Sequence, residues 1–216
     1  MRNFLLRLLT NRSQLFLLVL FLSTLPILRW FAAILLALVT LRQGAKAGSQ
    51  LVLAMALPIL LLIVFRKIGL LPASTQVINV LLLFGLSGLL RRYGSWQQLL
   101  QLLSLLGLVV VVVVHWRHPD IATVWSALLK PELATLKSLP AALSGGLSEQ
   151  ELPAMLDRIA RVATGLQVMM VSAVLLLNVA FGRYVQAALY NPGGLKTELY
   201  QLRLAKFYAS ALVALL

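Results

Sequence analysis

The sequence predicts an all-α protein, a polytopic transmembrane helical bundle of about six membrane helices with an amphipathic-helical loop at residues 117–161. Two observations predict this class. Long apolar runs each end at one or two basic residues, as at Arg66, Arg91 and Arg183, which is typical of a chain that crosses a bilayer repeatedly. The 216-residue chain is also 61% hydrophobic and only 12% charged, whereas a soluble domain has roughly 45–50% apolar and about 25% charged residues.

The net charge of the chain is +13, and cysteine is absent. In a soluble protein such a charge indicates nucleic acid, but here the Lys and Arg residues are spread between the apolar runs. We therefore expect no nucleic-acid partner, and we attribute the surplus charge to contact with the lipid bilayer. The absence of cysteine excludes disulfides, thiolate metal ligands and a cysteine nucleophile.

The first apolar segment allows two arrangements. Residues 1–14 form a basic amphipathic lead-in that we expect on the cytoplasmic surface, and residues 15–41 continue apolar without a signal-peptide cleavage site. As one helix, residues 15–41 would place Arg29 near the bilayer centre, at a cost of about 2.5–3.5 kcal/mol. As two short helices that meet at Pro26, they place Arg29 at the far interface beside Trp30. We favour this hairpin.

Four later segments predict membrane helices. They are residues 47–65, 70–90, 96–116 and 162–190. The third has a tryptophan at each end, and tryptophan marks the membrane–water interfaces. Its six consecutive valines would favour a strand in water, but a lone strand in lipid leaves its backbone unpaired, so we expect a helix.

Residues 117–161 form the predicted extracytoplasmic polar loop, which has five of the six acidic residues. Apolar residues at helical spacing predict a surface helix that stops at Pro131. A capping-box pattern, Ser148 with Glu151, predicts a second surface helix over residues 149–161.

The end of the sequence predicts a turn and a basic helix. Residues 191–206 are interpreted as an N-P-G-G turn followed by a basic cytoplasmic helix. Residues 207–216 are apolar but too few to span a bilayer, so we expect them to begin a further apolar helix in a longer protein.

The distribution of cations predicts the orientation. With the hairpin, eleven Lys and Arg residues fall on the inner side, whereas the short outer loops have only Arg29, Arg66 and Lys67. The long loop has five cations and five acids, and long loops weigh little in the positive-inside rule. We therefore expect a cytoplasmic N-terminus.

Four polar residues in or near the predicted spans are candidate ligand-binding residues: Gln167, Asn178, Gln76 and Asn79. Gln167 and Asn178 are eleven residues apart, which places them within about 20° of one another on a helix. Polar groups at membrane depth face the bundle interior or a cavity. The alternative is helix–helix hydrogen bonding, at about 1 kcal/mol per contact. Gln76 and Asn79, near the outer end of an adjacent span, leave the same two alternatives open.

Catalytic and metal motifs are absent from the sequence. His115 and His118 are three residues apart, but further ligands are lacking, so we expect no metal site. There is no H-E-x-x-H, G-x-S-x-G or phosphate-loop motif, and no Asp, Glu or Lys lies inside a confident span. We therefore expect no catalytic residue, no cofactor and no enzyme activity.

The most distinctive short string follows the last confident span. It consists of Tyr190, Asn191, Pro192, Gly193 and Gly194. Proline fixes φ and the two glycines permit a tight reversal, so the string predicts a turn. Together with residues 183–189 before it and Glu198 after it, the string resembles the signature of YybS-like proteins of gamma-proteobacteria, which are uncharacterised multipass inner-membrane proteins.

This resemblance implies the bacterial inner membrane. The family is distantly similar to the substrate-binding subunits of energy-coupling-factor transporters, which implies a helical bundle that binds a metabolite from outside and docks on cytoplasmic ATPase subunits. The bulky residues 15–21 depart from the A-x-x-x-A pattern of those subunits. We expect a non-enzymatic membrane component of small-molecule transport. The alternative is a structural or scaffolding membrane protein without a ligand, which organises partners through residues 117–161 or the basic helix.

Overall fold

The computed structural model describes residues 9–137 and 151–200, and no strand occurs among them. The helices are α2 (Arg12–Thr24), α3 (Arg29–Gln43), α4 (Ala45–Val64), α5 (Leu70–Tyr93), α6 (Trp96–Arg117), α7 (Ile121–Lys137), α8 (Glu151–Tyr190) and α9 (Gly194–Tyr200). Within this part of the chain, four segments are long and apolar enough to cross a membrane: Ala45–Val64, Pro72–Tyr93, Trp96–Arg117 and Ala154–Tyr190. The described part of the chain is thus all-helical, and four of its segments have the length and composition of membrane spans.

The number of such segments is smaller than the sequence predicts, and the difference lies in residues 15–41. The structure divides this segment between α2, which has 13 residues, and α3, which has 15. At 1.5 Å per residue these helices are about 20 and 22 Å long, whereas the hydrocarbon core is about 30 Å thick. Neither helix is long enough to cross a bilayer unless the bilayer thins locally or flanking side chains extend to the interface.

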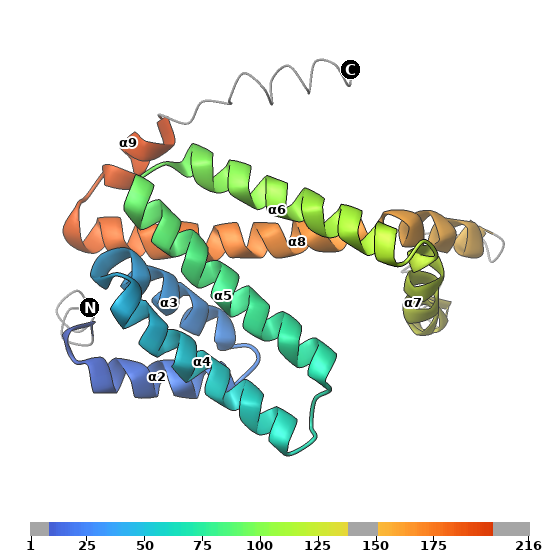
Figure 1. Cartoon of the computed structure of the whole chain (residues 1–216), viewed down its shortest axis with the longest axis horizontal. Helices are drawn as coiled ribbons and strands as arrows, with labels where there is room; N and C mark the ends of the chain where they lie inside the picture. The colour runs from blue at the N-terminus through green and yellow to red at the C-terminus, as the bar shows by residue number, and fades with distance from the viewer. Residues whose placement is uncertain (1–8, 138–150, 201–216) are drawn as a thin grey trace. The chain divides into compact units, whose positions relative to one another are not determined.

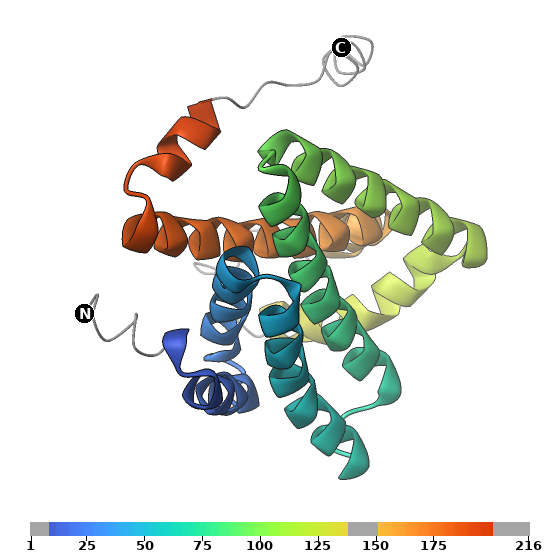
Figure 2. The ribbon, with the colours of Figure 1, turned by 60° about the vertical axis from the view of Figure 1, so that its left-hand side comes forward.

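The chain forms two compact units. The first consists of Met1–Gln101 and Val174–Leu216, and the second consists of Leu102–Ala173. In the first unit, α3 packs against α2, α4 and α5, and α4 packs against α2 and α5. Figures 1 and 2 show α4 and α5 side by side in both views. These four helices form the core that contains Ser23, Thr40 and Ser87, three of the buried polar residues described below.

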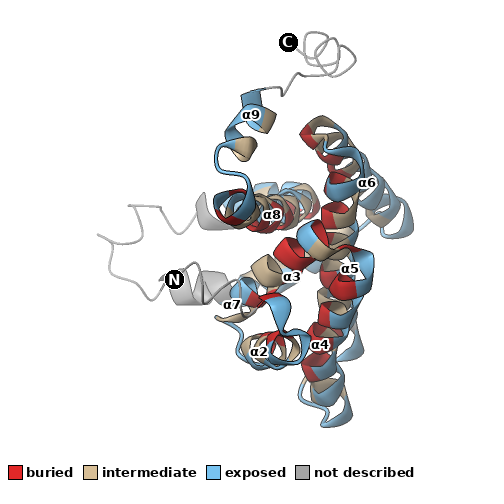
Figure 3. Cartoon of the chain, turned by 90° about the vertical axis from the view of Figure 1, so that its left-hand side faces the viewer, coloured by how far each residue is buried: buried red, intermediate tan, exposed pale blue. Residues whose placement is uncertain are grey.

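The core of the first unit lies around α3. Its residues from Leu36 to Leu41 are all buried, including Thr40. Figure 3 shows that the buried residues of α3, α4 and α5 lie on the sides that face one another, while the outer sides are exposed. α3 is therefore buried by protein through its second half, and the outward faces of α4 and α5 are the ones that would meet lipid.

The turns of the first unit explain why the helices end where they do. After α2, the backbone N–H of Arg29 donates to the carbonyl of Leu25 at 3.0 Å, across the turn that contains Pro26. After α3, Gly44 adopts a φ of 94°, which favours glycine, and its N–H donates to the carbonyl of Thr40 at 3.0 Å. The chain therefore reverses within a few residues at both ends of α3.

The second unit contains most of α6, all of α7 and the first part of α8. Trp125 of α7 donates through Nε1 to Oγ1 of Thr164 on α8 at 2.9 Å. A Cβ added at Gly107 of α6 would lie 2.9 Å from Cγ1 of Val168 on α8, so glycine permits the close approach of these two helices.

Two predicted helix ends in this region differ from the structure. α7 continues through Pro131 to Lys137, where the sequence predicts a stop, because a proline removes one backbone hydrogen bond without unfolding the turns on either side. The surface helix predicted over residues 149–161 and the span over 162–190 are a single 40-residue helix, α8. Ser148, residues 1–8 and residues 201–216 lie outside the described residues.

Candidate functional site

Five polar side chains are buried in the described part of the chain: Ser23, Thr40, Ser87, Thr164 and Asn178. The three hydroxyls of Ser23, Thr40 and Ser87 donate to carbonyls three or four residues earlier in their own helices, at 2.7–2.8 Å. Thr164 accepts the indole N–H of Trp125. These four side chains are therefore paired inside the protein, as buried polar groups generally are.

Asn178 differs from the other four because only half of its amide is paired. Nδ2 donates to the carbonyl of Val174, one turn earlier in α8, at 2.8 Å. Oδ1 is buried and has no hydrogen-bond partner among the described residues, and the residue is only 3% exposed. Leaving a buried acceptor unpaired costs about 1–3 kcal/mol. A hydrogen bond from any N–H or O–H group to this oxygen would therefore stabilise the folded protein.

Gln167, the predicted companion of Asn178, has an exposed side chain. Eleven residues along a helix correspond to about 16 Å, so the two amides do not contact one small polar group together. The two residues lie on one continuous helix, as the predicted common face requires, but the side chain of Asn178 is buried and that of Gln167 is exposed. We keep Asn178 as the candidate ligand contact of this pair.

Gln76 belongs to a second polar group, at the turn between α2 and α3. Its Oε1 accepts a hydrogen bond from Nη1 of Arg29. Nε of Arg29 also donates to the carbonyl of Ser23 at 3.3 Å. Asn79 is partly buried, one turn after Gln76 on α5. The structure thus gives Gln76 a partner inside the protein, which favours a packing role for this residue.

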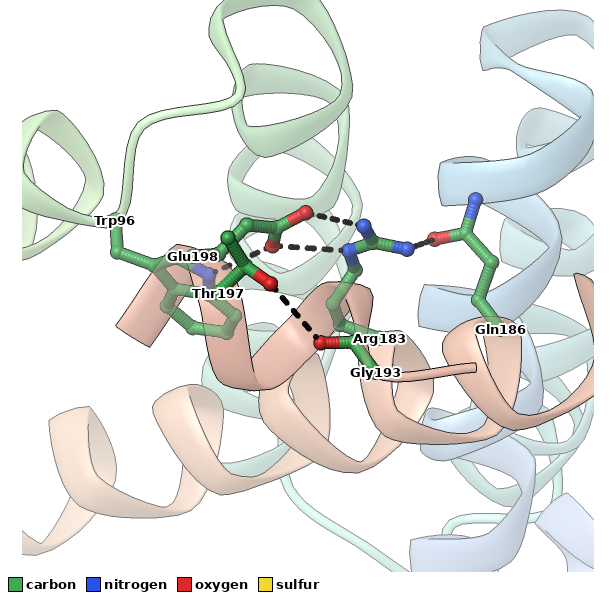
Figure 4. A network of polar contacts seen from close by, with 6 residues as sticks. All are labelled: Trp96, Arg183, Gln186, Gly193, Thr197 and Glu198. Carbon is green, nitrogen blue, oxygen red and sulfur yellow. Dashed lines mark hydrogen bonds and ion pairs between the residues drawn. The ribbon is translucent and has the colours of Figure 1, made fainter. Parts of the chain in front are cut away.

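A third polar group surrounds Glu198, and we call it the Arg183 cluster: Trp96, Arg183, Gln186 and Glu198. Arg183 forms an ion pair with Glu198 through Nη2, donates through Nε to Oε2 of Glu198 at 3.1 Å, and donates through Nη1 to Oε1 of Gln186 at 3.1 Å. Trp96 donates through Nε1 to the same Oε2 at 3.1 Å. In Figure 4 the carboxylate of Glu198 lies between the guanidinium and the indole. The cluster therefore ties α9 to α8 and to the first residue of α6.

The charge of Glu198 is maintained by these partners. Burial by itself raises the pKa of this carboxyl, but the hydrogen bonds from Arg183 and Trp96 and the positive charge of Arg183 outweigh it, so the net pKa is lowered. The side chains of Arg183 and Glu198 are 14% and 26% exposed. The pair is thus partly shielded from water and stays ionised at neutral pH.

The predicted turn at residues 190–194 lies beside this cluster. The ring of Tyr190 lies 4.2 Å from the guanidinium carbon of Arg42, a cation–π distance. Gly193 has a φ of 88°, and a Cβ added at Gly194 would lie 2.6 Å from Nδ2 of Asn191. The left-handed backbone at Gly193 favours glycine, whereas a Cβ at Gly194 would displace only the end of the Asn191 side chain. The backbone reverses here between α8 and α9.

A groove is lined in part by the turn itself. It has a volume of about 610 Å³ and is lined by Tyr184, Ala187, Ala188, Pro192, Gly193, Leu195, Lys196, Leu199 and Tyr200. Apart from Lys196, its walls are apolar and aromatic side chains and glycine backbone. The groove thus lies between the end of α8 and α9.

The sequence analysis did not predict the Arg183 cluster. Trp96 and Glu198 are 102 residues apart, so no local pattern connects them. One signal was available: Glu198 is the only acidic residue outside residues 117–161. A lone carboxylate among many cations pairs with one of them, although the sequence does not say with which.

The predicted absence of a metal site concerns His115 and His118. Both are exposed, and Nδ1 of His115 lies 2.9 Å from the carbonyl of Val111 in the same helix. Among the residues that the structure describes, no group of three or more His, Cys, Asp or Glu side chains could hold a metal ion.

Comparison of the chain with protein-family models, with curated proteins and with solved structures found no match.

Proposed function

We propose that this chain is a multipass protein of the bacterial inner membrane that acts as a non-enzymatic component of small-molecule transport. In this proposal α2 and α3 form a membrane hairpin, so that the chain has about six membrane helices, and the N-terminus is cytoplasmic. The resemblance to YybS-like proteins supports the transport role through the distant similarity of that family to the substrate-binding subunits of energy-coupling-factor transporters. That similarity implies cytoplasmic ATPase subunits as partners.

The observation that carries the proposal is the unpaired Oδ1 of Asn178. An isolated polar atom in the middle of a membrane helix is unfavourable, and such residues tend to mark ligand or ion pathways. The hydroxyls of Thr40 and Ser87, which are equally buried, are fully accounted for by their own helices. Asn178 is the exception, and an N–H or O–H donor from outside the chain would supply the missing hydrogen bond to its Oδ1.

The chemistry of the amide defines the class of ligand. Oδ1 is neutral and accepts hydrogen bonds, so it suits an uncharged or weakly polar molecule with an N–H or O–H group. The one charged side chain of α8 between residues 162 and 190 is Arg183, and it is already paired with Glu198, so this part of the helix offers no free charge to a ligand. We therefore propose a small, largely apolar metabolite with one or two hydrogen-bond donors.

The test compares Asn178→Leu with the wild-type protein and with Ser87→Ala, a matched change at a buried polar residue whose hydroxyl is already paired. Each purified full-length protein is heated in mild detergent with pools of small metabolites. A ligand present at 100 times its Kd stabilises the folded state by about 2.7 kcal/mol. We expect at least one pool to raise the Tm of the wild type and of Ser87→Ala but not that of Asn178→Leu.

Two results would contradict the proposal. Either no pool raises the Tm of the wild type, or every pool that does so acts equally on Asn178→Leu. In both cases Asn178 contributes only to helix packing.

A second candidate function, scaffolding without a ligand, is favoured by the groove at the α8–α9 turn. Its apolar walls next to Lys196 suit a partner segment with apolar side chains and an acidic residue. The test is purification of the full-length protein in mild detergent followed by mass spectrometry. Leu199→Glu is the groove variant. Val174→Glu is unsuitable as its control, because Val174 lies in the membrane span. A partner that is lost in Leu199→Glu supports scaffolding, and ATPase subunits that remain bound support transport.

A further inference from the structure

A groove lies between α2 and α4, away from the residues assigned above. It has a volume of about 450 Å³ and is lined by Arg12, Ser13, Phe16, Leu17, Gln50 and Leu53. Small-molecule sites generally have volumes of about 300–1,000 Å³. The groove combines one cation, one hydroxyl and one amide with three large apolar side chains, which is an amphipathic lining.

The two helices run in the same direction along this groove. Near their starts, Nε2 of Gln43, just before α4, donates to the carbonyl of Leu9 at 2.8 Å. Further along both helices, Oγ of Ser23 lies 3.4 Å from the carbonyl of Ala54. Because the residue numbers rise together, Arg12 lies at the beginning of the groove and Leu53 lies further along it. The lining therefore changes from polar to apolar along one axis.

The apolar part of the groove faces outward. Leu17 and Leu53 are each 62% exposed, and Leu53 lies within the candidate membrane span Ala45–Val64. Exposed leucines on a membrane helix contact acyl chains. The surroundings of this end of the groove are thus hydrocarbon.

Among the described residues, Arg12 in the polar part of the groove forms no ion pair. The first unit, Met1–Gln101 with Val174–Leu216, has Glu198 as its one acidic residue in the sequence, and Glu198 is paired with Arg183. Arg12 therefore needs an anion from outside the chain. Lys46, four residues before Gln50 on α4, adds a second exposed cation on the same helix face.

The length of α2 brings this cation close to the lipid phosphates. α2 begins at Arg12 and has 13 residues, about 20 Å, so a bilayer with a core of about 30 Å has to thin around it. Thinning draws the head groups toward Arg12. The guanidinium is also the side chain that matches phosphate oxygens with two parallel hydrogen bonds.

We propose that the α2–α4 groove binds one anionic glycerophospholipid of the bilayer. Its phosphate accepts hydrogen bonds from Arg12, Ser13 and Gln50, and one acyl chain lies along Phe16, Leu17 and Leu53. The site does not involve Asn178, but it rests on the proposed membrane hairpin of α2 and α3. It anchors the short hairpin at one depth in the membrane.

The experiment measures lipid binding to the full-length protein in mild detergent by native mass spectrometry, with phosphatidylglycerol and phosphatidylcholine as the two probes. Arg12→Ala removes the cation, and Ser13→Trp fills the groove while retaining Arg12. Arg92→Ala removes an exposed cation outside the groove and serves as the matched control.

We expect the wild type and Arg92→Ala to bind phosphatidylglycerol more tightly than phosphatidylcholine. Arg12→Ala should bind phosphatidylglycerol about tenfold more weakly, the effect of one hydrogen bond to a charged group, and Ser13→Trp should also lose binding. Equal losses in Arg12→Ala and Arg92→Ala would overturn the proposal in favour of diffuse attraction. Wild-type binding by Ser13→Trp, or equal affinity for the two lipids, would overturn it as well.

Discussion

The Arg183 cluster makes a prediction that tests how α9 is held in place. Glu198→Gln preserves the size of the side chain but removes the charge and one of the acceptor atoms that Arg183 and Trp96 use. Exposed ion pairs contribute about 0–1 kcal/mol, and hydrogen bonds to charged groups about 1.5–3 kcal/mol. Since the two side chains are 14% and 26% exposed, we expect a loss of about 1–2 kcal/mol, or a factor of about 5–30 in the opening of α9.

Hydrogen–deuterium exchange of the backbone amides of α9 measures this opening directly, because local unfolding sets the exchange rate. The full-length protein is compared in mild detergent with Glu198→Gln. Asp157→Asn is the control, since it makes the same chemical change at an exposed carboxylate of the second unit. We expect faster exchange of Gly194–Tyr200 in Glu198→Gln only. Wild-type exchange rates in this variant would refute a stabilising role for the cluster.

The same cluster predicts a pH dependence of defined sign. The pKa of Glu198 is lowered in the folded protein from its ordinary value of 4.5, so the unfolded state binds the proton more tightly. The stabilisation is therefore complete above pH 4.5 and is lost as the pH falls through the lower, folded value. Protection of α9 should be constant between about pH 6 and 8 and should decrease only in acid. A decrease that begins near neutral pH would contradict this assignment.

Three further predictions concern the helix packing and the topology. Gly182→Ala should lower the thermal stability by about 1–3 kcal/mol, because the added Cβ would lie 2.8 Å from Cβ of Ala37. Gly85→Ala, which meets nothing within 4 Å, should leave it unchanged or slightly raised. Arg91→Ala should cost about 1 kcal/mol in the same assay, since it removes the 2.9 Å hydrogen bond to the last turn of α3. In intact cells, a membrane-impermeant thiol reagent should label Lys67→Cys and leave Ala45→Cys unlabelled. The reverse labelling would exclude the hairpin with a cytoplasmic N-terminus.

The helices α4, α5 and α6 illustrate what hydropathy predicts well. Residues 47–65, 70–90 and 96–116 correspond to Ala45–Val64, Leu70–Tyr93 and Trp96–Arg117 in the structure. These bounds can be predicted because an apolar run ends where charged residues or glycine begin. In addition, a membrane helix forms all its backbone hydrogen bonds internally, so it needs no tertiary partner. Local composition is therefore enough to place them.

The long helix α8 shows where local patterns fail. A polar segment followed by an apolar one predicts a surface helix and a separate span, yet the backbone is continuous from Glu151 to Tyr190. Hydropathy records the change of surroundings along the helix, but it contains no signal for a break unless glycine or proline occurs there. Gly165 alone did not end the helix, because one glycine costs only about 1 kcal/mol in a helix interior.

The polar contacts were harder to predict than the helices because they depend on tertiary structure. Gln76 is an amide with the same sequence signal as Asn178, and only the structure shows that Arg29 already uses its oxygen. Likewise, Gln167 and Asn178 share a helical face, but their burial differs. The sequence identifies which polar residues lie at membrane depth, whereas the neighbouring helices decide which of them remain unpaired.

The three proposals use different kinds of unsatisfied group, which is why they can fail separately. Asn178 has a buried neutral acceptor, so it needs a donor and gains little from charge. Arg12 is an exposed cation in a unit whose only carboxylate is already paired, so it needs an anion. The α8–α9 groove has apolar walls beside a paired ion cluster, so it needs apolar surface. Salt weakens the second interaction most, weakens the third only through Lys196 and leaves the first unchanged, and this dependence distinguishes lipid binding at Arg12 from ligand binding at Asn178.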